Sequence, residues 1–199
     1  NWEGGYRVPA AMRWPGVIKP GTVNNDIFAH EDMLPTLLAA AGVPDVKAQL
    51  LKGMKVGDKT FKVHLDGYNF LPYLTGQEAK GPRIQFFYFS DDGAMVGMRY
   101  DNWKLVFQEQ RMPGTLQVWF EPFTNLRAPK LFNLRRDPFE RADHNSNTYW
   151  DWYLSKVYML IGAQGLVAQQ IENFVKYPPR QKPAAFNLDT VMEKLQNAS

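Results

Sequence analysis

The distribution of hydrophobic and polar residues changes near residue 83. After it, short apolar and aromatic runs are separated by turn residues, a pattern typical of strands. Consecutive strands joined by short turns pair antiparallel, so the pattern predicts one antiparallel sheet. The predicted strands are 86–89, 95–100 and 103–109, with further strands at 116–120 and 131–133.

A long amphipathic helix is predicted near the end of the chain, over residues 149–176. Gly162 and Gly165 weaken this helix. Asn187 is a candidate N-cap for a last short helix over 188–196. Because the apolar faces of a sheet and a helix have to be covered, we expect an α+β fold in which the antiparallel sheet packs on the long C-terminal helix.

Helix and turn signals dominate the first part of the chain. A turn at 29–34 leads into a helix that starts near Pro35 and ends at Gly42. The alternative is a single helix capped by Asp26, which Pro35 would break. The remaining predictions are a strand over 8–14 interrupted by Pro9, a short helix and polar loop over 43–57, a strand over 61–65, and one helical turn over 69–74.

Residues 76–83 are polar and punctuated by Gly and Pro, which marks the best domain boundary. We therefore expect two domains, residues 1–82 and residues 83–199. The net charge of +3 is small and no Lys/Arg run concentrates it, which argues against a nucleic-acid partner. The absence of cysteine excludes disulfides and thiolate metal sites but identifies no compartment.

No segment reaches the roughly 18 apolar residues of a transmembrane helix. The richest run, 157–161, stops at Gly162 and is interpreted as a buried helix or an oligomer contact, with a membrane-surface role as the alternative.

The first residues carry the most specific motif, Trp2-Glu3-Gly4-Gly5-Tyr6-Arg7-Val8-Pro9, followed by Arg13-Trp14-Pro15-Gly16. Together they resemble the type I sulfatases, in which a sulfate-binding lysine lies just upstream of this motif. Further matches in the same order are His30 to Leu38 with its Pro-Thr-Leu-Leu, Leu65 to Gly76, Trp103-Lys104-Leu105, Leu131 to Glu140, and Tyr177 to Phe186.

The resemblance implies that residues 1–82 are the tail of an α/β catalytic domain and residues 83–199 an α+β subdomain. The parent enzyme would hydrolyse a sulfate ester with a formylglycine nucleophile and with calcium or another divalent cation. No cysteine is present, and none of the serines begins a Ser-x-Pro-x-Arg motif. We therefore expect no catalytic or metal-binding residue in this chain and no activity of the chain alone. The family resemblance suggests a periplasmic or secreted parent, but the sequence itself leaves the compartment open.

The upstream catalytic domain is the expected partner of this chain. Because residues 1–82 would lack their sheet neighbours, we expect them to be disordered, rearranged or buried in a homo-oligomer or swapped assembly. Two other functions stay open: a non-catalytic module that binds sulfated glycans, and part of a related phosphoryl-transfer hydrolase.

The candidate site residues follow from the same resemblance. Asn1, Trp2 and His30 are candidates for lining the substrate pocket. The glycines after Glu3 would allow a close backbone approach or a positive φ, and Asp32 is expected to accept backbone N–H groups or to pair with Arg7 or Arg13. The residues expected to support the site structurally are Glu3, Gly4, Gly5, Arg7 and Asp32.

Other polar clusters are interpreted as structural. Asp91-Asp92 and Asp101-Asn102 have the letters of sulfatase metal ligands but lie in predicted turns, where Asp and Asn bond their own backbone. The adjacent His30, Glu31 and Asp32 point in different directions and do not suit one ion. His64 is expected to be structural and His144 solvated. The mixed charges Arg135, Arg136, Asp137, Glu140, Arg141 and Asp143 predict a solvated turn, with a patch for sulfated polysaccharide as the sharper alternative.

Overall fold

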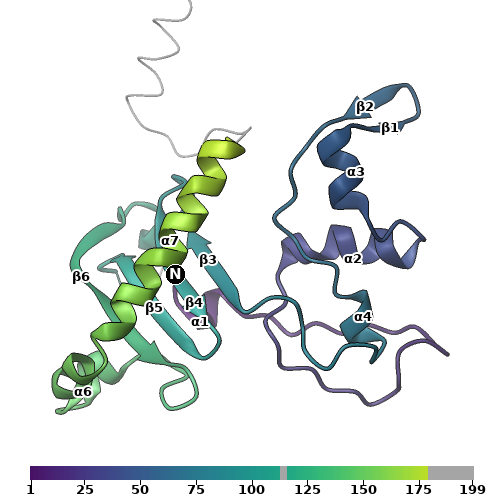
Figure 1. Ribbon diagram of the computed structural model, residues 1–199. Helices are drawn as coiled ribbons and strands as arrows, with labels where there is room; N and C mark the ends of the chain where they lie inside the picture. The colour runs from purple at the N-terminus through teal and green to yellow at the C-terminus, as the bar shows by residue number, and fades with distance from the viewer. Residues whose placement is uncertain (113–115, 179–199) are drawn as a thin grey trace, which may run out of the picture. The chain divides into compact units, whose positions relative to one another are not determined.

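The computed structural model describes residues 1–112 and 116–178, which form two compact units (Figure 1). The first unit, called the sheet unit, contains Asn1–Tyr6, Phe87–Met98 and the described residues from Asn102 onward. The second, called the helical unit, contains Arg7–Phe86 and Arg99–Asp101. The chain passes between units close to the predicted boundary, but its first six residues pack with the sheet unit. The assignment of the two segments to a catalytic domain and a subdomain stays a prediction.

A four-stranded antiparallel sheet forms the centre of the sheet unit, in the order β3-β4-β5-β6. Its strands are β3 (Gln85–Phe89), β4 (Met95–Tyr100), β5 (Trp103–Glu109) and β6 (Thr124–Asn133). Strands β5 and β6 pair with Trp103 opposite Asn133, and the register shifts between Val106 and Gln108. The predicted strand at 116–120 is wrong, because Leu116–Trp119 form the 3-10 helix η2, and the last strand starts earlier than predicted.

Close packing between neighbouring strands explains the glycine in β4. A Cβ built on Gly97 would lie 2.7 Å from the carbonyl oxygen of Leu105 in β5, so a side chain does not fit there. The turn between the same strands places Asp101 at φ 50, which confirms the prediction that Asp101-Asn102 serves turn geometry. Asp91 and Asp92 likewise lie in a turn, which ends at Gly93 with φ 78.

In the described residues up to 178, three helices follow the sheet: α5 (Ala142–Asn145), α6 (Tyr149–Ser155) and α7 (Tyr158–Lys176). The predicted single helical region therefore breaks at Lys156 and Val157, while both of its glycines lie inside α7. Helix α7 lies along the sheet (Figure 1) and contributes Ala163 to the core, which confirms the α+β prediction. The predicted helix over 188–196 lies outside the described residues.

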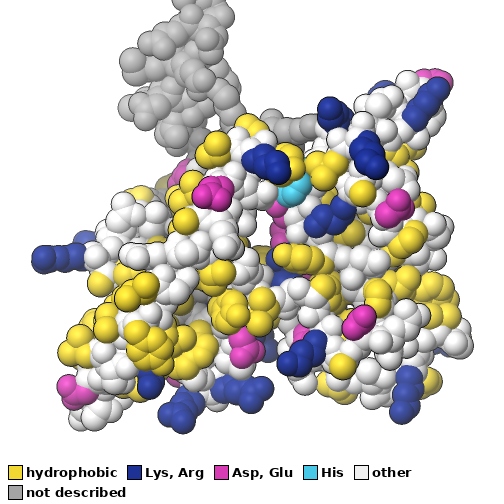
Figure 2. Space-filling view, in the orientation of Figure 1, with side chains coloured by type: hydrophobic (Ala, Val, Ile, Leu, Met, Phe, Trp, Pro, Cys, Tyr) yellow, Lys and Arg dark blue, Asp and Glu magenta, His cyan; other side chains and the backbone are white. Residues whose placement is uncertain are grey.

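The apolar run at 157–161 is only partly buried. Met159 and Leu160 pack against the core, whereas Tyr158 and Ile161 are exposed. Figure 2 shows hydrophobic side chains gathered on the surface over α6. An oligomer contact through this run stays a prediction. No helix in the described ranges is long and apolar enough to cross a membrane.

Short elements make up the helical unit, and two strand predictions there are wrong. Its elements are η1 (His30–Asp32), α2 (Met33–Ala40), α3 (Val46–Lys52), β1 (Met54–Val56), β2 (Lys59–Phe61) and α4 (Leu71–Leu74). Residues 8–14 form no strand, since Pro9 lacks the N–H group that a ladder needs. The hairpin β1-β2 turns at Gly57, with φ 59, where a polar loop was predicted. The strand predicted over 61–65 overlaps β2 only at Phe61, and residues 62–65 form no strand.

The helix predictions in this unit are confirmed. Helix α2 begins two residues before Pro35, and Gly42 follows it with φ 92, the left-handed conformation of a helix C-terminus. Helix α4 is followed by Gly76 with φ 77. The core of the unit contains Val46, Leu50 and Phe70, so the unit has an apolar centre of its own.

Candidate functional site

A buried charge cluster surrounds Lys104 of β5 in the sheet unit. The Lys104 side chain is 0% exposed, and its Nζ lies 2.8 Å from Glu140 Oε1 and 3.2 Å from Glu3 Oε1. The same ammonium lies 4.3 Å from the centre of the Tyr88 ring, a cation–π contact. The Tyr88 hydroxyl donates to Glu3 Oε1. The Lys104 ammonium and the Tyr88 hydroxyl thus help to compensate two buried carboxylates.

The same cluster holds the first residues of the chain. Lys104 Nζ donates to the backbone oxygen of Asn1 at 2.6 Å, and the Asn1 side chain donates to the backbone oxygen of Gln108 at 2.6 Å. The backbone N–H of Glu3 donates to Glu140 Oε2 at 2.7 Å. These bonds attach the first residues of the chain to strand β5 and to the residues that follow β6.

Aromatic contacts fix the rest of the segment. Trp2 meets Phe132 of β6 edge-on, with ring centres 6.1 Å apart. Tyr6 meets the Tyr88 ring edge-on at 4.7 Å, and its hydroxyl donates to the backbone oxygen of Phe89 at 2.9 Å. Residues 1–6, which we call the N-terminal segment, are therefore attached to the sheet at both ends.

Burial and the neighbouring cation act in opposite directions on Glu140. Burial raises the pKa of the Glu140 carboxyl above its ordinary value, and the charge of Lys104 opposes that rise. Glu140 also has φ 55, a left-handed conformation that is uncommon for a residue with a side chain. The solvated turn predicted around residues 135–143 is therefore wrong for Glu140, which is buried.

Asp143 is a second correction to that turn. Its side chain is 4% exposed, and its Oδ2 forms an ion pair with Lys130 Nζ at 2.7 Å. Lys130 Nζ also lies 2.7 Å from Glu109 Oε2. Asp137 is instead used locally, because its carboxylate accepts the N–H groups of Arg141 and Ala142. Acidic residues that look solvated in the sequence thus serve long-range packing.

Gly4 and Gly5 lie in the helical turn α1 (Glu3–Tyr6), which the sequence did not predict. Neither has a positive φ, and a Cβ on either would meet no atom within 4 Å in the described structure. The prediction of a positive φ is therefore wrong, while a close approach of this backbone to a sulfate site stays a prediction.

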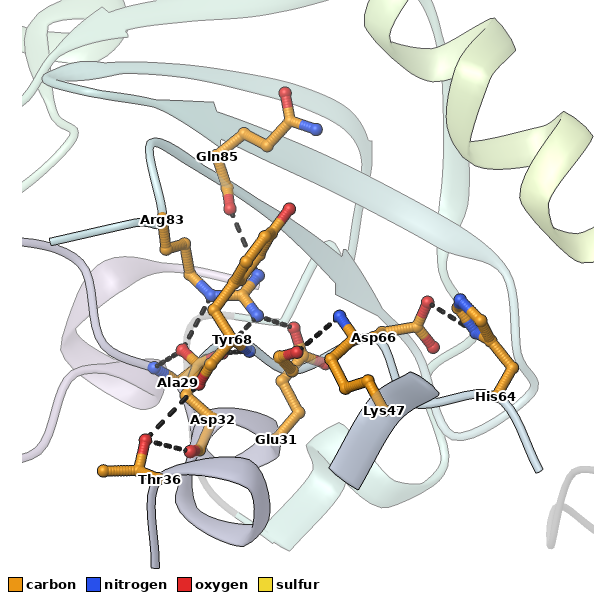
Figure 3. A network of polar contacts seen from close by, with 11 residues as sticks. Ala29, Glu31, Asp32, Thr36, Lys47, His64, Asp66, Tyr68, Arg83 and Gln85 are labelled. Atoms are coloured by element: carbon orange, nitrogen blue, oxygen red, sulfur yellow. Dashed lines mark hydrogen bonds and ion pairs between the residues drawn. The ribbon is translucent and has the colours of Figure 1, made fainter. Parts of the chain in front are cut away.

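A second polar network organises the helical unit around Asp32 (Figure 3). The Asp32 side chain is 0% exposed and pairs with Arg83 through two bonds, Nε to Oδ2 at 2.8 Å and Nη2 to Oδ1 at 2.7 Å. Such a two-bond pair is the strongest geometry for these groups. Arg83 Nη2 also lies 2.5 Å from Glu31 Oε1, and the guanidinium packs 4.8 Å from the centre of the Tyr68 ring.

Asp32 also accepts backbone donors. The N–H groups of Ala29 and Tyr68 donate to it at 2.8 and 2.7 Å, as the sequence predicts, but its charge partner is Arg83 and not Arg7 or Arg13. One carboxylate thereby joins the start of α2 to the chain before α4.

Glu31 and Lys47 have shifted pKa values at the edge of this network. Burial raises the pKa of the Glu31 carboxyl, and the charge of Arg83 opposes the rise. Burial lowers the pKa of the Lys47 ammonium, which donates to the backbone oxygen of Gly67 at 2.7 Å. His64 lies 3.5 Å from Asp66, and the two side chains point toward each other (Figure 3). Among the described residues, no three His, Asp or Glu side chains form a group that could hold a metal ion.

Gly67 is required by the packing of this network. A Cβ at Gly67 would lie 1.8 Å from the backbone oxygen of Glu31, so Gly67→Ala has to displace backbone on one side. We expect a loss of about 3 kcal/mol in unfolding free energy, at the upper end of overpacking effects. Calorimetric unfolding measures it. The matched control is Gly162→Ala inside α7, where a Cβ meets nothing within 4 Å and a gain of about 1 kcal/mol is expected. Equal effects of the two variants would contradict the prediction.

The residues that the sequence singles out belong to both units. Asn1, Trp2 and Glu3 lie together in the sheet unit, and Arg7, His30 and Asp32 lie in the helical unit. His30 is exposed. His144 is 76% exposed, as predicted for a solvated residue, and His64 is mostly buried but outside any strand. The pocket roles of Asn1, Trp2 and His30 stay predictions.

Sequence reasoning missed the cations of both networks. Lys104 and Glu140 lie in motifs that match the sulfatases, but the sequence assigned neither residue a place in the site. Arg83 lies in the polar segment 76–83, which was predicted to be a domain boundary. One signal was available for Lys104: it stands in a run of apolar residues in a predicted strand, where an inward charge needs a buried partner.

Comparison with known proteins gives one consistent result. The chain is 38% identical over 150 residues to "Arylsulfatase A" of Homo sapiens, which covers 70% of this chain and 26% of that protein. It is 34% identical over 163 residues to "Ulvan-active sulfatase" of Formosa agariphila (72% and 30%) and 31% identical over 156 residues to "Steryl-sulfatase" of Mus musculus (71% and 23%). No family model matches the chain.

A solved structure shares the fold. The crystal structure of PsFucS1 sulfatase from Pseudoalteromonas sp. superposes with a TM-score of 0.58 and 23% identity, over 85% of this chain and 30% of that one. The chain therefore spans between about a quarter and a third of the length of the relatives that it matches.

Proposed function

Because this chain is homologous to sulfatases over about 70% of its length, we propose that it is the C-terminal portion of an enzyme that hydrolyses sulfate esters. The observation that carries the proposal is the identity of 31–38% to three proteins named as sulfatases, found together with the fold of a sulfatase. The two alternatives, a glycan-binding module and a phosphoryl-transfer hydrolase, have no such support.

The chain does not carry the chemistry of the whole reaction. A formylglycine needs a cysteine or serine in a Cys/Ser-x-Pro-x-Arg motif; this sequence has no cysteine, and none of its serines begins such a motif. A divalent cation needs several oxygen ligands, and the described residues form no such group. The residues present do not fit either cofactor, so both would come from an upstream catalytic domain, the proposed partner of this chain.

The role that remains for this chain is structural support of the active site. In sulfatases the Trp-Glu-Gly-Gly segment follows the sulfate-binding lysine, and here the matching residues Trp2 to Gly5 are held rigidly on the sheet. A rigid support keeps reacting groups in position, which is a large part of catalysis.

An activity assay tests the proposal. This chain alone, with added calcium, should release no sulfate from an aryl sulfate above the buffer background. A longer polypeptide that carries the upstream domain with its formylglycine should hydrolyse the same ester. Turnover by this chain alone would contradict the claim that the catalytic groups lie outside it, and an inactive longer polypeptide would contradict the sulfatase assignment.

A further inference from the structure

The geometry points to a positioning role for Lys104, Tyr88 and Glu140: we propose that they form an anchor that fixes the N-terminal segment on the sheet and thereby sets the edge of the sulfate site. This inference rests on the proposed function, since only that function places the segment beside the reacting ester. The anchor itself is a property of this chain.

Burying the charges of this cluster carries a desolvation penalty that apolar core residues would not have. Lys104 is 0% exposed, and a buried ion pair is often no more stabilising than apolar residues of similar volume. A buried lysine is therefore better explained by the specific geometry that it imposes. All three of its polar partners belong to the N-terminal segment or bind it: the Asn1 oxygen, the Glu3 carboxylate and the Glu140 carboxylate.

The residues of the anchor come from three separate parts of the sheet unit. Tyr88 lies in β3, Lys104 in β5, and Glu140 in the chain between β6 and α5. They meet on Glu3, whose carboxylate contacts Tyr88 and Lys104 and whose N–H group donates to Glu140. A group held from three sides cannot shift without disturbing regular structure, which is the requirement for a precisely placed site.

Tyr88 contacts the N-terminal segment at two points, in its middle and at its last residue. Its hydroxyl donates to Glu3, and its ring packs edge-on against Tyr6 at 4.7 Å. Tyr88→Phe removes only the hydroxyl and keeps the ring contacts with Tyr6 and Lys104. This substitution therefore loosens the anchor with little risk of unfolding.

Hydrogen–deuterium exchange on this chain tests the anchor directly. Tyr88→Phe should raise the exchange of the amides of Gly5 and Tyr6, which donate to Trp2 O, by about tenfold, as expected for losing a bond to a charged group. The control is Tyr153→Phe, which removes a hydroxyl bonded to the backbone oxygen of Pro129 in the same unit. It should leave these amides unchanged. Unchanged exchange in Tyr88→Phe would overturn the anchor.

Kinetics of the longer, active polypeptide test the positioning role. Tyr88→Phe should lower kcat by about tenfold and change KM less than about twofold, because misplacement of the site acts on the transition state. Tyr153→Phe should change neither constant. Faster exchange with an unchanged kcat would overturn the positioning role. A longer polypeptide without any activity would overturn the proposed function, while the exchange result would still decide the anchor.

Discussion

Replacement of Asp32 by alanine should lower the unfolding free energy of the helical unit by roughly 3–5 kcal/mol, the largest effect expected in that unit. The substitution leaves the Arg83 guanidinium, 6% exposed, without its two-bond partner. It also removes the acceptor of the Ala29 and Tyr68 N–H groups. Because Glu31 stays 2.5 Å from Arg83, we place the loss toward the lower end of this range.

Amide exchange of residues in α2 measures this loss for the helical unit alone, which matters because the chain has two compact units. The double variant Asp32→Ala/Arg83→Met should be more stable than Asp32→Ala, since it removes the uncompensated charge. Asp66→Ala is the control, because Asp66 is 48% exposed and its ion pair with His64 is long. If Asp32→Ala costs no more than Asp66→Ala, the network does not stabilise the unit.

Local patterns predicted the elements whose cause is local. The three consecutive strands from 86 to 109 were found because apolar runs and turn residues define each of them within a few positions. Helix α2 and its end at Gly42 were found because Pro and Gly mark helix ends in the sequence itself. These elements would be predicted equally well in an unfamiliar sequence.

Elements determined by distant partners were missed. Asp32 and Arg83 are 51 positions apart, and Glu3 and Glu140 are 137 apart, so no local pattern pairs them. The break between α6 and α7 falls at Lys156, where the sequence has no Gly or Pro. Gly162 and Gly165, which were predicted to weaken the helix, lie inside α7. Tertiary packing decided these cases against local propensity.

The candidate site was also predicted only in part from the sequence. The motif at residues 2–9 indicated the family from letters alone, and the comparisons confirm it. The reason why the motif's glutamate is present became clear only from its contacts: Glu3 is buried against Lys104 and Tyr88. The motif therefore indicated the family, and the contacts in the fold showed what Glu3 binds.

Replacement of Lys104 by methionine should lower the unfolding free energy of the sheet unit by roughly 3–5 kcal/mol at neutral pH, because Glu3 and Glu140 lose their buried cation. The loss should depend on pH. Burial already raises the pKa of Glu140 and Lys104 opposes that rise, so removal of Lys104 raises the pKa further.

The sign of the pH effect follows from that shift. A carboxyl whose folded pKa exceeds its unfolded value, near 4.5 here, contributes stability that is fully present below the unfolded pKa and is lost as the pH rises through the folded pKa. The deficit of Lys104→Met should thus be smallest at or below about pH 4.5 and should grow as the pH rises from there through the folded pKa of Glu140. Urea unfolding at a series of pH values, followed by amide exchange in β5, measures it.

A second substitution separates charge from packing. In Lys104→Met/Glu140→Gln the neutral amide cannot ionise, so the part of the pH dependence that comes from Glu140 should disappear and part of the stability at neutral pH should return. The matched double variant Lys104→Met/Glu121→Gln alters a carboxylate outside the cluster and should keep the full pH dependence. A deficit in Lys104→Met that is the same from acid to neutral pH would show that Lys104 acts through its volume, and the buried charge cluster would then have no part in holding the N-terminal segment.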